Sequence, residues 1–187
     1  MRFIRSPLSR EDAASLTLGS VVSLSGPIVT ARDEAHMRAL EHLREGKAVP
    51  ECLYGSVLFH CGPIMARDGD GWKAIAAGPT TSARMNSMEP EMIRRFGIRA
   101  IIGKGGMSRE VCAAMKECGC VYLAATGGAA VSIAESLPKV LGAEWEDLGM
   151  AEAVWKFEAD RMGPLIVAID ANGDSLYERV SESLVRI

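Results

Sequence analysis

The sequence predicts one α/β domain with a mixed sheet, spanning residues 1–187. Two observations lead to this class. The N-terminal third is rich in strand-like runs, whereas the middle of the chain alternates short apolar runs with amphipathic ones. At 187 residues the chain is long enough to bury one core of ordinary size, and no internal repeat or low-complexity linker divides it.

The first predicted elements are a strand and a helix. The β-branched run "SVVSLSGPIV" at 20–29 predicts a strand that ends in a turn where Gly26 precedes a proline. The run "TARDEAHMRALEHLREG" predicts a helix over 31–45, with Thr30 and Asp33 as a capping box and a glycine at its end.

A hairpin and then an alternation of helices and strands are predicted for the rest. "SVLFHCGPIMARDGDGWKAIAAGP" predicts two strands joined by a turn at 68–71. The segments that follow predict, in order, a helix in "EPEMIRRFGI", a strand in "IRAIIG", a helix in "MSREVCAAMKECG", a strand in "CVYLAATGG", a helix in "AAVSIAESLP" and a closing hairpin in "PLIVAIDANGDSLYERV".

Composition and charge exclude several classes of function. The hydrophobic fraction of 48% and charged fraction of 24% are those of a folded globular chain. A net charge of −3 provides no basic field, which argues against nucleic acid or an anionic membrane as partner. No apolar run approaches the ~20 residues of a membrane span, and the N-terminus lacks a secretory signal. We therefore expect a cytoplasmic protein.

The five cysteines do not predict a metal site made by this chain alone. Their odd number does not fit a disulfide scaffold. The spacing of Cys118 and Cys120 is too tight for a zinc knuckle, and no histidine follows nearby. Reduced, buried thiols are the simpler interpretation.

The loop "GPTTSARMNSMEP" at 78–90 carries more polar groups than a turn requires. Between Thr80 and Arg84, four of five side chains bear a hydroxyl or guanidinium group. An ordinary turn needs only one or two glycine, proline, asparagine or aspartate residues. The loop is therefore either an unusually polar turn or a binding site for an anionic oxygen ligand.

Three cations stand near predicted strand-to-helix junctions, namely Arg32, Arg84 and Lys104. A cation near a helix N-terminus opposes the helix dipole, unless an anion bridges it to the free N–H groups. Singly, each is explained by a solvated side chain. Together, two guanidinium forks and one ammonium group indicate a small polyanion, a dicarboxylate in particular. The run around Lys104, "IIGKGG", lacks Walker A spacing and so does not predict a nucleotide.

The motifs "SGPIVTARDEAH", "GPTTSARMNS", "IGKGGM", "ATGGAA", "EDLGMAEAVWKFEAD" and "DANGDSLYE" resemble those of the β subunit of class I fumarate hydratase and L-tartrate dehydratase. The same unit forms the C-terminal domain of the single-chain enzymes. The resemblance implies a swivelling β/β/α fold with a mixed, partly barrel-like sheet. It further implies a partner α subunit that holds a 4Fe–4S cluster, no cofactor on this chain alone, and an α2β2 assembly.

The resemblance also assigns roles to five residues. Arg32 matches the family's substrate-carboxylate arginine in "ARDEAH". Thr80 and Thr81 match the paired threonines, and Arg84 and Lys104 match the cations that hold the substrate. In this reading the chain hydrates fumarate to L-malate, and Thr80 acts either as the base or only as a hydrogen-bonding ligand.

Two departures from the family pattern leave alternatives open. Ala83 and Asn86 replace a glycine and an aspartate that are common in the family. They bear on substrate preference, so an L-tartrate dehydratase β subunit and a non-catalytic dicarboxylate-binding module are both retained. His36 lies on the helix face of Arg32 and either joins the site or packs, while His60 is expected to be a satisfied strand histidine.

Overall fold

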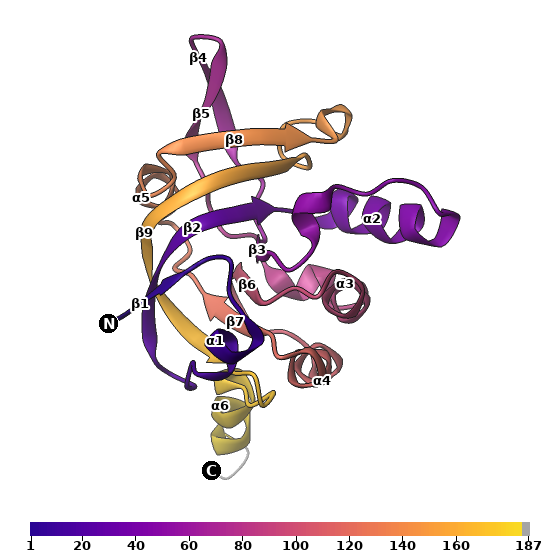
Figure 1. Cartoon of the computed structure of the whole chain (residues 1–187). Coiled ribbons are helices and arrows are strands. Elements are labelled where there is room, and N and C mark those ends of the chain that lie inside the picture. The colour runs from indigo at the N-terminus through magenta and orange to yellow at the C-terminus, as the bar shows by residue number, and fades with distance from the viewer. Residues whose placement is uncertain (185–187) are drawn as a thin grey trace.

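The computed structural model describes residues 1–184, which form one large sheet, a separate hairpin and six α-helices (Figure 1). The strands are β1 Arg2–Arg5, β2 Val21–Thr30, β3 Val57–Phe59, β4 Ile64–Asp68, β5 Gly71–Ala76, β6 Ala100–Gly103, β7 Val121–Ala124, β8 Lys139–Glu144 and β9 Val154–Ile169. The helices are α1 Arg10–Ala14, α2 Asp33–Glu45, α3 Glu89–Phe96, α4 Arg109–Cys118, α5 Ala130–Glu135 and α6 Leu176–Leu184.

The large sheet closes on itself. Its order is β1-β2-β3-β6-β7-β9-β8, and a further pairing of β2 with β9 joins five strands into a ring. The pairs from β1 through β7 are parallel, whereas β9 runs antiparallel to β2, β7 and β8. This confirms the predicted mixed, partly barrel-like sheet.

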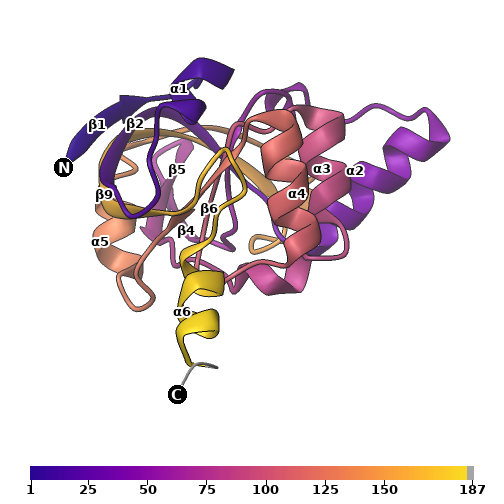
Figure 2. The same cartoon turned by 90° about the horizontal axis from the view of Figure 1, so that it is seen from below.

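Both faces of the central strands are buried, and each face belongs to its own hydrophobic cluster. Along β3, Val57 and Phe59 face the interior of the ring, while Leu58 faces the outer layer. Alternate residues of β6 and β7 divide in the same way, as a period of two requires. Helices α2, α3 and α4 lie side by side over the outer layer (Figures 1 and 2).

Two N-terminal predictions were wrong. The strand at 20–29 does not turn at Gly26; it continues to Thr30 as β2, because a bulge opposite β9 absorbs the irregular backbone. Thr30 is not a helix cap either. It ends β2, and its hydroxyl accepts a hydrogen bond from Trp155 N at 3.0 Å, so Arg32 becomes the N-cap of α2. Gly46 ends the helix as predicted, with φ of 67°.

The predicted hairpins had different outcomes. The turn at 68–71 joins β4 and β5 as expected, although "VLF" at 57–59 forms a separate strand, β3, in the main sheet. The closing hairpin was wrong: β9 is followed by a turn and then by α6. The Asp170 carboxylate accepts hydrogen bonds from the N–H groups of Asn172 and Asp174, which fixes that turn.

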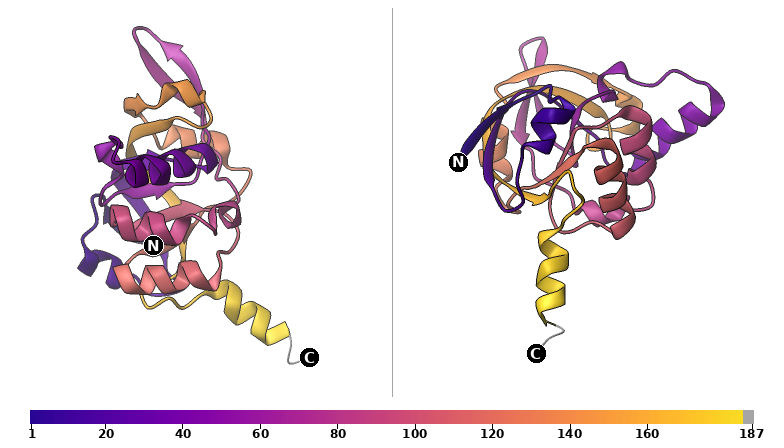
Figure 3. Two further views of the ribbon diagram at one scale, coloured as in Figure 1. Left: turned by 90° about the vertical axis from the view of Figure 1, so that its right-hand side faces the viewer. Right: turned by 60° about the horizontal axis from the view of Figure 1, so that its bottom comes forward.

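The C-terminal helix α6 projects away from the sheet (Figure 3). It buries none of its residues, and Val180 and Leu184 are exposed apolar side chains on it. Among the described residues, no helix has the length and apolar character needed to cross a membrane.

Candidate functional site

The candidate residues follow parallel strands that end at one edge of the sheet. Arg32 lies two residues beyond β2, and Lys104 directly follows β6. The intervening strand β3 links them, because Ala31 N donates to Phe59 O at 3.1 Å and His60 N donates to Ile102 O at 2.8 Å. The carboxyl edge of parallel strands is the usual place for ligands in α/β sheets.

The threonine loop packs against Lys104 through its backbone. Thr81 and Lys104 form an isolated parallel β-bridge. Ser82 N donates to Lys104 O at 3.0 Å, and Lys104 N donates to Thr80 O at 3.4 Å. On its other side, Thr80 N donates to His60 O at 2.6 Å. The structure thus brings both threonines and the lysine together, although they lie more than 20 residues apart in the sequence.

The two arginines meet at Asp33. Arg84 pairs with its carboxylate through Nη2 to Oδ2 at 2.8 Å and through Nε to Oδ1 at 3.1 Å. Arg32 Nε lies 3.6 Å from the same carboxylate and 2.6 Å from Glu152 Oε1. The Arg84 side chain is half exposed, so its remaining donors face solvent. All five predicted residues therefore lie at one edge, with three cationic groups among them.

A protein carboxylate occupies the position where the sequence predicted a bridging anion at α2. Glu152 contacts Arg32 through Oε1 and accepts a hydrogen bond from Glu34 N through Oε2 at 3.0 Å. It therefore joins the cation to the N-terminus of the helix. No local signal could reveal this residue, because about 120 positions separate it from Arg32.

The start of α4 is likewise capped by the protein. The Ser108 hydroxyl accepts from Val111 N at 3.5 Å, and the Ser108 N–H donates to Asn86 Oδ1 at 3.0 Å. Asn86, one of the two departures from the family pattern, thus links the threonine loop to α4. An aspartate at this position would offer the same acceptor atom.

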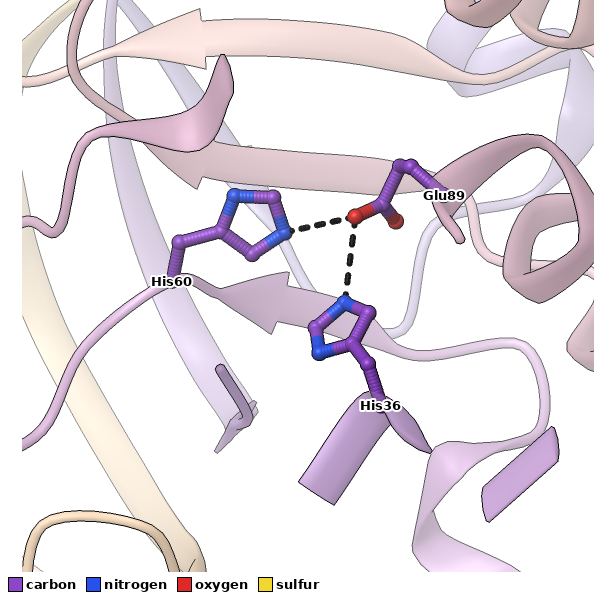
Figure 4. Close-up of side chains that lie close together, drawn as sticks. All are labelled: His36, His60 and Glu89. Carbon is purple, nitrogen blue, oxygen red and sulfur yellow. Dashed lines mark hydrogen bonds and ion pairs between the residues drawn. The ribbon is translucent and has the colours of Figure 1, made fainter. Parts of the chain in front are cut away.

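Three buried ionisable groups lie beneath the loop. His36 comes from the first turn of α2, His60 follows β3, and Glu89 is the first residue of α3 (Figure 4). All three side chains are completely buried. His36 Nε2 donates to Glu89 Oε2 at 3.1 Å, and His60 Nε2 lies 3.0 Å from the same oxygen, off the hydrogen-bond axis. The sequence singled out both histidines but not Glu89.

The carboxylate and the histidines shift one another's pKa values. Burial alone would raise the pKa of Glu89, but the two histidines lower it to about 2. Burial alone would lower the pKa of His36, but the Glu89 carboxylate raises it above its ordinary value. For His60 burial prevails, and its pKa lies below the ordinary value.

The cysteines show no features of a cluster site. Cys61, Cys112 and Cys120 are buried, and burial raises the pKa of Cys61 to about 12 and that of Cys112 to about 11. Within residues 1–184, the one group of three metal-ligand residue types that comes together is the buried histidine–glutamate set.

Comparisons with known proteins agree on one family. Residues 3–180 match the family described as Fumarase C-terminus. A protein of Methanocaldococcus jannaschii, named provisionally as L(+)-tartrate dehydratase subunit beta, is 44% identical over 98% of this chain and 95% of its own length. The L(+)-tartrate dehydratase subunit beta of Escherichia coli K12 is 37% identical over 94% of this chain and 86% of its own.

A third relative is a longer protein. A chain of Geobacillus stearothermophilus, named provisionally as class I fumarate hydratase, is 38% identical over 96% of this chain but only 34% of its own length. The present chain therefore corresponds to about a third of that protein.

Proposed function

The chain belongs to the Fumarase C-terminus family, which includes tartrate dehydratase β subunits and class I fumarate hydratases, and from that premise we propose that it is the β subunit of a two-subunit hydro-lyase. Its first candidate reaction is the reversible hydration of fumarate to L-malate. The second is dehydration of L-tartrate, which the names of two near-full-length relatives favour. The protein itself would then be a single β-subunit domain over residues 1–187.

One observation carries the proposal: Arg32, Arg84 and Lys104 gather with two threonines at a single sheet edge. Guanidinium groups bind carboxylates bidentately, and an ammonium group adds a point charge. Negative charge grows on a substrate carboxylate when the neighbouring carbon loses its proton in the dehydration direction, or when hydroxide adds to the other carbon of the double bond in the hydration direction. Fixed cations at that carboxylate would stabilise the transition state more than the ground state.

Thr80 is the candidate for moving the proton at the carbon that does not carry the hydroxyl. Its backbone N–H and C=O are both hydrogen-bonded, so the loop holds this residue firmly. A threonine hydroxyl is a weak base at pH 7 unless nearby cations lower its pKa. Lys104 is the adjacent cation on the neighbouring segment. Thr81 would position the substrate beside it.

The rest of the chemistry requires a partner. Among the described residues, the five cysteines do not come together as a ligand group for an iron–sulfur cluster. We expect a 4Fe–4S cluster on an α subunit, where it would supply Lewis-acid chemistry, in an α2β2 assembly. The cationic edge then belongs to a composite site, and this chain contributes its carboxylate-binding half.

Kinetics of the assembled enzyme test the proposal. We expect Arg84→Lys to lower kcat/KM for the dicarboxylate about 100-fold, because a single ammonium group cannot keep both bonds to Asp33 and also offer a pair of donors to the substrate. Arg94→Lys is the matched control, because Arg94 on α3 forms an exposed ion pair with Glu117 on α4 and contacts none of the candidate residues through it. Equal kinetics for the two variants would refute the carboxylate clamp. An unchanged kcat in Thr80→Val would exclude Thr80 as the base and leave it a ligand.

A further inference from the structure

The buried cluster of His36, His60 and Glu89 connects the two segments that carry the candidate site. His36 N and His36 Nδ1 both lie 2.9 Å from the carbonyl oxygen of Arg32. On the other side, the His60 carbonyl accepts the hydrogen bond from Thr80 N. Glu89 joins the two histidines from α3 (Figure 4). Three elements are thus tied together directly beneath the cationic edge.

A second branch of the cluster reaches the interior of the threonine loop. His60 Nδ1 lies 2.9 Å from the Ser82 hydroxyl, which also accepts a hydrogen bond from the Tyr122 hydroxyl at 3.0 Å. Ser82 is completely buried, although its neighbours Thr81 and Ala83 are exposed. The loop is therefore held from inside through this serine.

The partners of each ring nitrogen determine where the protons lie. The carbonyl of Arg32 can only accept, so His36 Nδ1 carries a proton. His36 Nε2 carries a second proton when it donates to an ionised Glu89. Because Ser82 accepts from Tyr122, its own proton is free to reach His60 Nδ1. His60 is then neutral, with its proton on Nε2.

This assignment leaves the buried cluster with no net charge. One carboxylate balances one imidazolium, whereas an unbalanced charge at a fully buried position would be costly. Glu89 is also the first residue of α3, where the helix dipole favours a negative group. The raised pKa of His36 and the lowered pKa of His60 agree with this assignment. The other titratable groups that face the cluster are Asp33, Cys120 and Tyr122.

Histidine and glutamate are also common zinc ligands, and the donor atoms of His36, His60 and Glu89 lie within 4.8 Å of one another. A structural zinc site has four protein ligands, and a catalytic one keeps a position open to solvent. Among residues 1–184, this set gathers three groups, all completely buried. Three completely buried groups provide neither a fourth protein ligand nor an open position, so a charge-balanced set is the better account.

We propose that Glu89 is a positioning residue of the candidate site: by holding a protonated His36 and a neutral His60, it fixes the backbone of Arg32 and of the Thr80–Arg84 loop. The inference rests on the proposed function only for its kinetic readout. The protonation states are properties of the fold and can be measured separately.

The test combines NMR with kinetics on the complex of this chain with its partner subunit. The β chain is labelled with 15N-histidine, and its three histidines are assigned from single substitutions. At pH 8 we expect His36 to retain both ring protons and His60 to carry one, on Nε2. In Glu89→Gln we expect His36 to become neutral and kcat/KM to fall about 100-fold.

Glu91→Gln is the matched control. Glu91 lies two residues further along α3, pairs with Arg44 on the surface and touches none of the cluster. We expect its histidine signals and kinetics to match those of the wild type. If Glu89→Gln does not assemble with the partner, Glu89→Asp is used instead. The aspartate keeps the negative charge, so His36 should stay protonated. Its shorter side chain no longer contacts both histidines, so kcat/KM should still fall.

Four outcomes would each overturn a different part of the proposal. A neutral His36 in the wild type at pH 8 would overturn the charge assignment. If the wild-type complex contains one metal ion at this cluster per chain, and Glu89→Gln lacks that ion, the cluster is a metal site and the charge assignment is wrong. Wild-type kinetics in Glu89→Gln, with His36 neutral, would overturn the positioning role. A wild-type complex without hydro-lyase activity, but with the expected histidine signals, would reject the proposed function alone.

Discussion

Gly103 is the position where the smallest change should disturb the candidate site most. It ends β6 and directly precedes Lys104. A Cβ added there would overlap the Ser82 hydroxyl, and it would lie 3.3 Å from Ser82 Cβ and 3.0 Å from the Tyr122 hydroxyl. Gly103→Ala must therefore displace Ser82 or move the backbone of β6.

These contacts indicate how far Gly103→Ala lowers the free energy of unfolding. Overpacking a filled interior costs about 1–3 kcal/mol. Displacing Ser82 also breaks its hydrogen bonds with His60 and Tyr122, at about 1 kcal/mol each. The sum of about 4 kcal/mol corresponds to a fall in Tm of roughly 10 °C for a chain of this size.

Thermal unfolding followed by circular dichroism measures this fall. Gly71→Ala is the control, because its Cβ would meet only Asp68 O, at an ordinary 3.6 Å. Adding Ser82→Gly to Gly103→Ala should recover part of the loss, since it removes both Ser82 atoms and leaves only the contact with the Tyr122 hydroxyl. Equal melting temperatures for Gly103→Ala and Gly71→Ala, or no recovery in the double variant, would refute the packing argument.

Three other predictions concern the same edge. Gly62→Ala should lower kcat/KM of the assembled enzyme by up to about 100-fold, because its Cβ would lie 2.7 Å from Arg32 Nη1; unchanged kinetics would contradict it. Asn86→Ala should destabilise the chain by about 1 kcal/mol through loss of the acceptor for Ser108 N, whereas Asn86→Asp should not, as denaturant titration would reveal. Because the pKa of Glu89 falls below its ordinary value of 4.5 on folding, its carboxylate stabilises the fold above pH 4.5, and this contribution is lost as the pH falls toward 2. Glu89→Gln should lack this part of the acid loss, and an equal loss in both proteins would count against the assignment.

Local patterns predicted the elements of the middle of the chain well, because apolar runs and glycine stops act over short distances. Gly46 and Gly119 end α2 and α4 in left-handed conformations, as their places in the pattern indicated. Predictions failed where a distant partner decides. Thr30 has the sequence of a cap, but it bonds to Trp155 on β9 instead.

Some residues of the candidate site could likewise be predicted from local sequence, and others could not. Residue types and their order indicated the cations and threonines, which the backbone then brings to one edge. Glu152 and Glu89 were missed, because each acts across a long stretch of sequence on groups of other elements. A buried carboxylate beside a proline at the start of α3 has the same local pattern as an exposed one. Only the fold distinguishes them.

The central claim is that the cationic edge of this chain binds a dicarboxylate in a two-subunit hydro-lyase. It is tested most directly by purifying the tagged chain without oxygen and measuring iron content and the turnover of fumarate and of L-tartrate. We expect a co-purifying iron–sulfur subunit and turnover of one of these substrates, with kcat/KM much reduced in Arg84→Lys. A chain that arrives without iron and turns over neither substrate, under conditions that preserve complexes, would contradict it.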